Sequence, residues 1–252
     1  MSAPSGTRLV AHQLRYEQLS FWRNPQSAFF TFIFPVVIIV IFGAVFGQKG
    51  DFDRGLTGLQ YYIPTIAALS VLGACYTQLA IGLAFRRQTG ILKRVRATPL
   101  PASSYFLGLL AHCMILSVIE VAIIVGVGAL YGVPLPHHWL AIIVTLMLGA
   151  ASFCALGVGV ASLIHDAEAA PAVVQFVLLP LVFISGTYFP IHSTVLNRIA
   201  DVFPVRPLNE ALIGPFARHA GVSGGHLAVL LAWGVAGALI GVRRFRWDPR
   251  PE

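Results

Sequence analysis

The chain has 252 residues, of which 57% are hydrophobic and only 11% are charged, and its mean hydropathy is +0.78. Soluble domains carry about 25% charged residues. So few charged residues cannot cover a surface that faces water on all sides. Much of the surface must therefore be apolar and face lipid. This composition excludes intrinsic disorder, a disulfide-stapled secreted module and a nucleic-acid-binding domain, and it predicts an integral membrane protein. Because the apolar segments show no alternation at period 2, we expect it to be all-α.

The first 28 residues precede the first apolar run and are predicted to form a cytoplasmic amphipathic interface helix. On a helix drawn at about 100° per residue, the segment 7–23 separates a basic arc from an apolar arc. The basic arc holds Arg8, His12, Arg15 and Arg23, and the apolar arc holds Val10, Leu14, Phe21 and Trp22. Such a helix is suited to lying on the membrane surface. Asn24-Pro25 should break it, because the residue before a proline avoids the helical region.

Six apolar segments approach or exceed the roughly 20 residues that a helix needs to cross the hydrocarbon core. They are residues 29–47, 61–85, 105–130, 139–164, 169–189 and 226–242. We therefore predict that residues 29–252 form one transmembrane domain of six spans. The small residues around Gly149, Gly157 and Gly159 favour close packing of helices within the chain, with dimerisation through them as the alternative.

The positions of the basic residues predict the orientation of the spans. With six spans, both termini share a side with the second-to-third and the fourth-to-fifth connections. That side holds most of the 17 lysines and arginines, and basic residues concentrate on the cytoplasmic side of membrane proteins. Both termini are therefore predicted to be cytoplasmic. Basic residues on the cytoplasmic side, in contact with membrane lipid, account for most of the net charge of +7. This charge therefore requires no nucleic-acid partner.

The connection between the second and third spans, residues 86–101, is the first candidate functional segment. It carries no acidic residue and five basic ones, which are Arg86, Arg87, Lys93, Arg94 and Arg96. A positive anchor on the cytoplasmic side would explain these charges. The spacing of Ile91, Leu92 and Val95, closed by Thr98-Pro99, also predicts a short helix that presents both apolar and basic groups. Such a helix is suited to docking in a groove of another protein, and composition alone does not decide between anchor and docking helix.

The second candidate segment separates the last two spans. Ser185-Gly186 and Phe189-Pro190 end the fifth apolar run, and the apolar stretch 195–203 that follows is too short to cross. Apolar stretches of about 10–14 residues beside a span are often re-entrant or interfacial. We predict a re-entrant extracellular segment over residues 190–216, with an ordinary extracellular loop as the alternative.

Glu120 is the one formally charged residue inside a predicted span. Charged groups at that depth are costly and mark functional sites by default. Three interpretations stay open: a protonated carboxyl hydrogen-bonded between helices, a contact to a cationic substrate, or a proton relay. Gln78 and Gln175 favour interhelical hydrogen bonds over ligand contacts.

Other reactive residues predict no chemistry on this chain. Cys75, Cys113 and Cys154 lie in apolar runs without paired spacing, and His137-His138 have no evident third ligand. The sequence contains no phosphate-binding P-loop, no zinc-protease motif and no nucleophile elbow. We expect the chain to be no enzyme and to bind no metal or cofactor itself.

Three motifs in this order resemble the ABC type-2 permease family, in the branch of daunorubicin-resistance-type permeases of bacterial drug and lipid exporters. They are Arg-Ala-Thr-Pro-Leu-Pro at 96–101, Phe-Ile-Ser-Gly-Thr-Tyr-Phe-Pro-Ile at 183–191 and Phe-Pro-Val-Arg-Pro-Leu-Asn-Glu-Ala-Leu at 203–212. The resemblance covers nearly the whole chain. One departure is the run Arg86-Arg87-Gln88-Thr89-Gly90, which lacks the acidic residue that the family places before this glycine.

The resemblance implies the permease subunit of an ATP-driven exporter in the bacterial plasma membrane, moving a hydrophobic or amphipathic drug, lipid or polyketide. The chain would pair with an identical or paralogous permease, and two copies of a separate ATPase subunit would bind ATP and magnesium. The residues implied in ATPase coupling are Arg86, Arg87, Gly90, Lys93, Arg94, Arg96 and Pro99. The implied coupling helix spans residues 86–99, and the helix over residues 7–23 would brace it.

The two remaining groups of site residues concern the substrate. The candidate pathway residues are Glu120 and Gln78. The implied extracellular gate comprises Ser185, Gly186, Phe189, Pro190, Pro204, Pro207 and Glu210. The alternative function is a gradient-driven, proton-coupled secondary transporter or a channel that uses Glu120.

Overall fold

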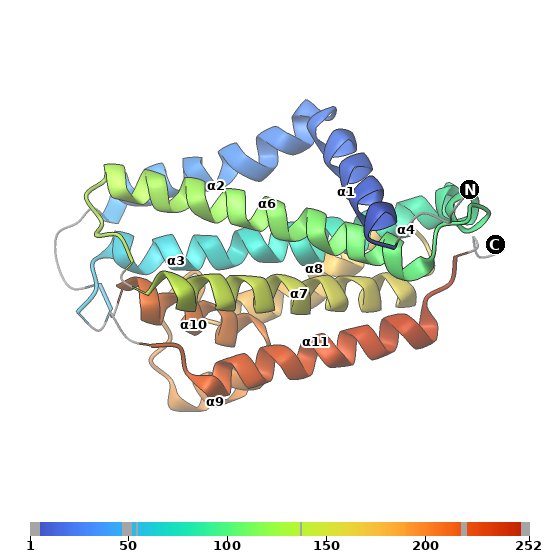
Figure 1. Cartoon of the computed structure of the whole chain (residues 1–252). Coiled ribbons are helices and arrows are strands. Elements are labelled where there is room, and N and C mark those ends of the chain that lie inside the picture. The colour runs from blue at the N-terminus through green and yellow to red at the C-terminus, as the bar shows by residue number, and fades with distance from the viewer. Residues whose placement is uncertain (1–5, 47–51, 54, 137, 218–220, 248–252) are drawn as a thin grey trace.

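The computed structural model describes residues 6–46, 52–53, 55–136, 138–217 and 221–247, and its helices in these ranges pack into one elongated bundle (Figure 1). No strand occurs among these residues. The first half of the chain contributes α1 (Gly6–Trp22), α2 (Pro25–Phe46), α3 (Gly58–Val71), the π-helix η1 (Leu72–Thr77), α4 (Gln78–Gln88) and α5 (Ile91–Arg96). The second half contributes α6 (Ala102–Leu130), α7 (Trp139–Leu163), α8 (Ala170–Ile184), α9 (Thr194–Val202), α10 (Val205–Ala217) and α11 (Gly224–Arg244).

The amphipathic segment at the start of the chain forms α1, which lies at an angle to the long axis of the bundle (Figure 1). The chain breaks before Pro25 as predicted, but residues 25–28 already belong to the next helix. Proline suits the first position of a helix, and Asn24 Oδ1 caps α2 by accepting a hydrogen bond from Ser27 N at 3.2 Å.

Among the described residues, five helices are long and apolar enough to cross a membrane, where the sequence predicted six. They cover Pro25–Val45, Gly58–Gln88, Ala102–Leu130, Trp139–Leu163 and Gly224–Arg244. The predicted fifth span, 169–189, is represented by α8, whose 15 residues fall short of the roughly 20 that a spanning helix needs.

The helix α8 ends early for a local reason. The Ser185 hydroxyl donates to the Val182 carbonyl at 2.7 Å, which satisfies one of the last carbonyls of the helix. Gly186 then adopts a left-handed backbone with φ of +78°, which stops the helix and turns the chain. The apolar run therefore continues to Phe189 while the helix does not.

The second apolar segment is continuous but contains the π-helical turn η1 near its middle. Turns of this type occur frequently at functional sites. A methyl group at Gly157 of α7 would lie 3.1 Å from the carbonyl oxygens of both Cys75 and Tyr76. The absence of a side chain at Gly157 thus lets α7 approach the backbone of η1.

Glycines also join α7 to α11, as the predicted packing within the chain requires. A Cβ atom on Gly237 would lie 2.6 Å from the Leu156 backbone nitrogen, and one on Gly159 would lie 3.0 Å from the Gly237 carbonyl oxygen. The two helices therefore pack backbone against backbone, in the manner of small-residue helix pairs in membranes.

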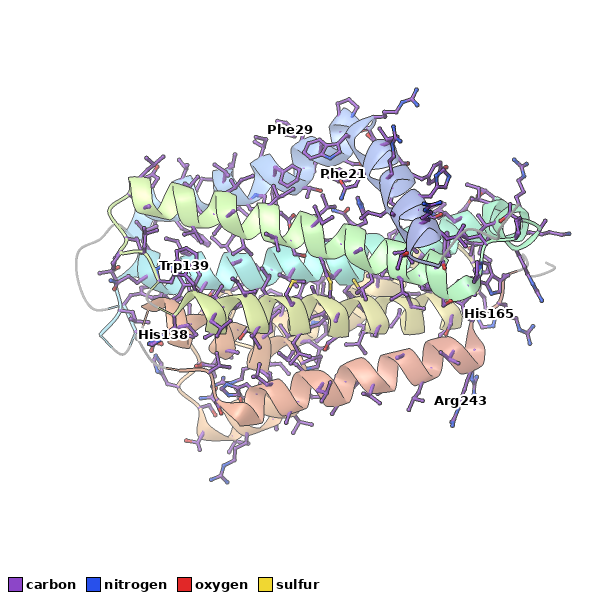
Figure 2. The ribbon with its side chains drawn as sticks, in the orientation of Figure 1. Phe21, Phe29, His138, Trp139, His165 and Arg243 are labelled. Carbon is purple, nitrogen blue, oxygen red and sulfur yellow. The ribbon has the colours of Figure 1, made fainter. Side chains whose placement is uncertain are left out.

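The two ends of the bundle carry different elements. The start of α1, the helix α5 and the end of α11 lie at one end, which we call the terminal end (Figure 1). The start of α3, together with α9 and α10, lies at the other, which we call the distal end. His165 and Arg243 mark the terminal end in Figure 2, and His138 and Trp139 mark the distal end.

Candidate functional site

The short helix α5 at the terminal end carries three of the seven predicted coupling residues, Lys93, Arg94 and Arg96. Gly90 takes a left-handed backbone with φ of +71°, which turns the chain between α4 and α5. Leu92 is fully buried and anchors α5 to the bundle. Lys93, Arg94, Arg96 and Pro99 are exposed beside the exposed Ile91. The helix therefore offers one apolar and several basic side chains at its surface.

Arg87 points into the bundle. Its side chain is buried, and it donates through Nη1 to the Ala161 carbonyl at 3.0 Å and through Nη2 to the Ile164 carbonyl. These carbonyls lie at the end of α7, where a cation compensates the negative end of the helix dipole. Nearby, Gln88 Oε1 accepts from the Ala167 backbone at 3.0 Å. The end of α4 is thus attached to the α7–α8 connection.

Arg86 forms a bidentate ion pair with Glu17 of α1, with Nη1–Oε1 at 2.7 Å and Nη2–Oε2 at 2.6 Å. Its Nη1 also donates to the Tyr105 hydroxyl at 3.1 Å. Paired planar groups of this kind are the strong class of hydrogen-bonded ion pairs. Of the seven predicted coupling residues, Arg86 and Arg87 therefore bond within the chain and attach α4 to α1, α6 and α7.

Glu17 and Gln13 are buried polar residues beside Arg86 that the sequence reasoning did not single out. Both are buried on α1, and Gln13 Nε2 donates to Glu17 Oε1 at 2.7 Å. Gly108 of α6 lets α1 approach α6 closely at Gln13, because a Cβ atom on Gly108 would lie 2.6 Å from Gln13 Cγ. The available signal was an acidic residue one turn after a glutamine in a segment that is otherwise basic.

A cavity of about 530 Å³ lies beside α2, α3, η1 and α8 and brings the two predicted pathway residues together. Glu120 and Gln78 both line it, and Gln175 of α8 joins them. Gln78 Nε2 donates to Thr31 Oγ1 of α2 at 3.0 Å, which confirms the interhelical hydrogen bond expected of Gln78. The remaining lining is mostly apolar and aromatic.

Glu120 has an unusual environment. Its side chain is 4% exposed, and its Oε2 atom has no hydrogen-bond partner among the described residues. The structure therefore shows no interhelical hydrogen bond to this oxygen in the described part of the chain. His112, two turns earlier on α6, packs its ring against Phe21 with centroids 5.7 Å apart.

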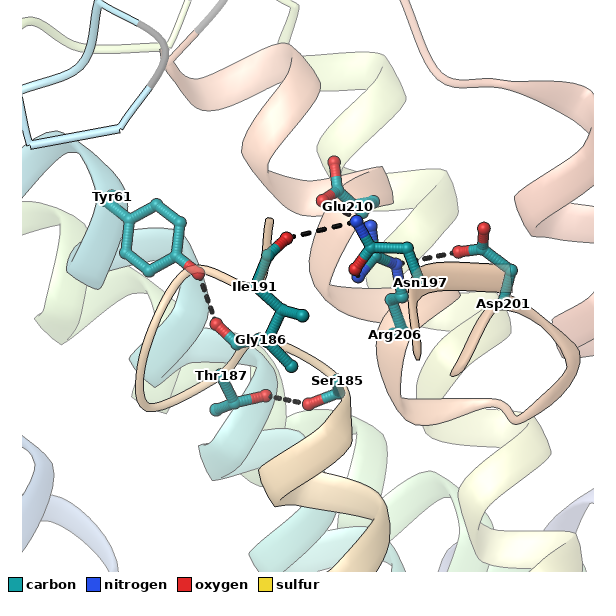
Figure 3. A network of polar contacts seen from close by, with 9 residues as sticks. All are labelled: Tyr61, Ser185, Gly186, Thr187, Ile191, Asn197, Asp201, Arg206 and Glu210. Carbon is teal, nitrogen blue, oxygen red and sulfur yellow. Dashed lines mark hydrogen bonds and ion pairs between the residues drawn. The ribbon is translucent and has the colours of Figure 1, made fainter. Parts of the chain in front are cut away.

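The distal end holds a network that ties the loop after α8 to α3 (Figure 3). The Tyr61 hydroxyl donates to the Gly186 carbonyl, and the Tyr62 hydroxyl donates to the Tyr188 carbonyl at 2.9 Å. Ser185 and Thr187 share a hydrogen bond within the loop. Two tyrosines that the sequence reasoning did not single out thus hold the loop that begins the predicted gate.

A second part of this network joins α9 to α10 through Arg206 (Figure 3). Arg206 Nε pairs with Asp201 Oδ1 at 2.8 Å, its Nη1 donates to Asn197 Oδ1, and its Nη2 lies 3.7 Å from Glu210 Oε1. Asn197 Nδ2 donates to the Ile191 carbonyl at 3.0 Å. Of the other predicted gate residues, Pro204 and Pro207 are buried, Pro190 is half-buried, and Phe189 is 66% exposed.

The three cysteines are buried free thiols on η1, α6 and α7, as expected of core residues. Cys75 Sγ lies 3.2 Å from Ser117 Oγ. No group of three or more potential metal ligands occurs among the residues that the structure describes. His138 is exposed before α7, and its neighbour His137 falls outside those residues.

Comparisons with known proteins agree on the kind of molecule. A family model described as ABC-2 type transporter matches residues 9–216. The inner membrane transport permease YadH of Escherichia coli strain K12 and the permease of the same name in Shigella flexneri are each 26% identical over 174 residues. The aligned part covers 63% of this chain and 64% of each relative, so it spans less than two thirds of their length.

Proposed function

The chain belongs to the ABC-2 type transporter family, and we propose that it is the permease subunit of an ATP-driven exporter. As a member of this family with several membrane-length apolar helices, it is a multi-pass membrane transport permease. In the proposed exporter, a separate ATPase subunit binds ATP and magnesium. Two copies of that subunit serve a pair of permeases, and this chain supplies the route across the membrane.

The observation that carries the proposal is the construction of the terminal end. The helix α5 exposes Ile91, Lys93 and Arg94 while Leu92 holds it in the bundle. A force applied to α5 reaches α4 through the Gly90 turn. Because Arg86 and Arg87 attach α4 to α1, α6 and α7, these helices would move together. A helix that docks the ATPase subunit requires an exposed surface and a firm connection to the other helices, and α5 has both.

We further propose that α8 completes six spans. Its ends are attached to the two ends of the second apolar helix: Ala167 to Gln88 at the terminal end, and Gly186 to Tyr61 at the distal end. The α8 segment therefore extends between elements at opposite ends of the bundle. With six crossings, the two termini share the basic side with α5, which makes that side cytoplasmic.

A second permease, identical or paralogous, is proposed to pack against the face of α2 and α8. Large apolar side chains on both helices are exposed there, including Phe30, Phe34, Phe176 and Phe183. The cavity opens between these helices, so a partner on this face would close its lipid side and leave a pathway between the subunits. Its mostly apolar lining suits a hydrophobic or amphipathic substrate.

Co-purification tests the proposal. The tagged chain is extracted from bacterial membranes in mild detergent, and co-eluting proteins are identified by mass spectrometry. We expect a stoichiometric ATPase that is lost from the double variant Lys93→Glu/Arg94→Glu, because reversing two exposed charges of α5 opposes docking. The matched control, Arg243→Glu/Arg244→Glu, reverses two exposed charges at the same end and should retain the ATPase.

Two results would contradict the proposal. Loss of the ATPase from both double variants would remove the assignment of docking to α5. Absence of any ATPase in several detergents would favour the alternative, a gradient-driven transporter. For that class the specific observation is the buried Glu120 without a hydrogen-bond partner for Oε2, and transport would then follow the proton gradient instead of ATP.

A further inference from the structure

The cavity beside α2, α3, η1 and α8 combines an aromatic wall with several polar groups. The aromatic side chains come from α2, α3 and the loop after α8, and they are Phe30, Phe34, Phe42, Tyr62 and Tyr188. The polar side chains are Thr31, Ser70, Thr77, Gln78, Glu120, Gln175 and Thr187. No lysine, arginine or histidine lines the cavity. Among the described residues that line the cavity, Glu120 is therefore the only one with an acidic or basic side chain, and its charge when ionised is negative.

The carboxyl of Glu120 has no structural bond that explains its position. Its side chain is nine-tenths or more buried, Oε2 has no hydrogen-bond partner, and no ion pair among the described residues involves it. Buried polar groups are normally satisfied, and those that are not call for an explanation. Acidic residues inside membrane spans commonly face a substrate or ion pathway. Glu120 lines the cavity beside α2, α3, η1 and α8.

We propose that this cavity binds a lipophilic organic cation and that Glu120 is the residue selecting its charge. A delocalised monocation would supply the partner that Glu120 lacks. Aromatic ring faces attract cations, and the wall provides several of them. The volume of about 530 Å³ falls within the roughly 300–1,000 Å³ of small-molecule sites. The side-chain amides and hydroxyls of the lining add dipoles without a competing positive charge.

The position of the cavity suits a ligand that arrives from the bilayer. It lies between α2 and α8, whose outer faces carry exposed apolar side chains, so its open side faces hydrocarbon in the isolated chain. While no second permease covers this face, an amphipathic cation that partitions into the membrane would reach Glu120 without crossing water. The claim that the cation is transported rests on the proposed exporter function, whereas the claim that the cavity binds it does not.

Direct binding to the full chain in detergent tests the inference without any ATPase. The probes are tetraphenylphosphonium, a lipophilic cation, and triphenylphosphine oxide, a neutral molecule with similar aromatic groups, each titrated by calorimetry. We expect the wild-type chain to prefer the cation. Glu120→Gln should weaken cation binding about tenfold or more, because it removes the negative charge that attracts the cation at a site shielded from water. Neutral-probe binding should not change.

The control variant is Glu168→Gln, which removes an exposed carboxyl at the α7–α8 connection and should bind both probes as the wild type does. A second variant, Phe34→Leu, removes one ring face while keeping the wall apolar, and it should weaken cation binding while Glu120 is intact. This variant keeps the inference testable where Glu120→Gln does not fold.

Three outcomes would overturn the inference: equal affinity of the wild type for both probes, unchanged cation binding in Glu120→Gln, or a tightly bound phospholipid that neither probe displaces. Failure here is distinct from failure of the exporter proposal. If the chain co-purifies with an ATPase but does not prefer the cation, the exporter proposal stands and the cation-binding inference is wrong. If the chain prefers the cation but no ATPase co-purifies, the inference stands and the exporter proposal is wrong.

Discussion

Glu17 and Arg86 lie 69 residues apart in the chain and meet in a bidentate pair between α1 and α4. Glu17 is 3% exposed and Arg86 is 26% exposed, so the pair is largely removed from solvent. Removing one member of such a pair leaves the other charge uncompensated. At the scale of single residues, this contact decides how firmly α1 is held to the bundle.

We predict that Glu17→Gln lowers the free energy of unfolding by about 2 kcal/mol, less than the 3–5 kcal/mol of fully buried pairs because Arg86 retains some solvent. Arg86→Gln should cost a similar amount, and the double variant should cost less than the two together. Thermal unfolding in detergent measures these changes, with the exposed Arg15→Gln as control. Additive losses in the double variant would mean that the two residues do not interact.

The same scale shows what the charge pattern could not reveal. The five basic residues of the segment 86–101 look equivalent in the sequence, yet Arg86 and Arg87 point inward while Lys93, Arg94 and Arg96 are exposed. Which arginine finds an acidic or carbonyl partner depends on α1 and on the end of α7. Both are far away in the chain, and no local spacing records them.

At the scale of elements, glycines set the distance between helices. The pair α7 and α11 touches through Gly159 and Gly237, where an added Cβ atom would collide with backbone of the facing helix. Backbone cannot yield as the end of a flexible side chain can. The helices would therefore have to separate, and they would lose contacts along their length.

We predict that Gly237→Ala destabilises the chain, whereas Gly126→Ala leaves stability unchanged or raises it. A Cβ atom at Gly126 of α6 meets no atom within 4 Å, and alanine is favoured over glycine in a helix by about 1 kcal/mol. Both changes add one methyl group to a helix interior, so helix propensity is matched and only packing differs. Equal melting temperatures in detergent for the two variants would argue against the close α7–α11 contact.

Secondary structure was accessible from the sequence to different degrees. The apolar runs predict the long helices, and the basic-apolar spacing predicts α1 and α5, which the structure contains. The early end of α8 and the π turn η1 are not encoded in hydropathy. The first follows from Ser185 and Gly186, whose effect depends on backbone conformation. The second lies within a long hydrophobic segment whose hydropathy does not distinguish a π-helical turn from an α-helical one.

At the scale of the whole molecule, the open question is which side each end of the bundle faces. The proposed topology places α5 in the cytoplasm and α9 outside, with α8 crossing between them. The native cysteines are all buried, so an introduced cysteine can be labelled against a low background.

We predict that an impermeant thiol reagent labels Val195→Cys in intact cells, because Val195 is 68% exposed on α9. Thr98→Cys, exposed after α5, should react only after the cells are permeabilised. Labelling of both positions only after permeabilisation would mean that α8 does not cross the membrane. Labelling of Thr98→Cys in intact cells would reverse the proposed orientation.

The sequence by itself determined that this is a helical membrane protein of the ABC-2 type. Hydropathy and the positions of basic residues set which segments enter the membrane and which side they face, and the motifs are short enough to be seen without the fold. The tertiary structure alone decided that Glu120, Gln78 and Gln175 line one cavity. It also decided that Glu17 pairs with Arg86 and that Tyr61 holds Gly186. These contacts join distant segments, and they form only when helices pack at distances set by the residues between them.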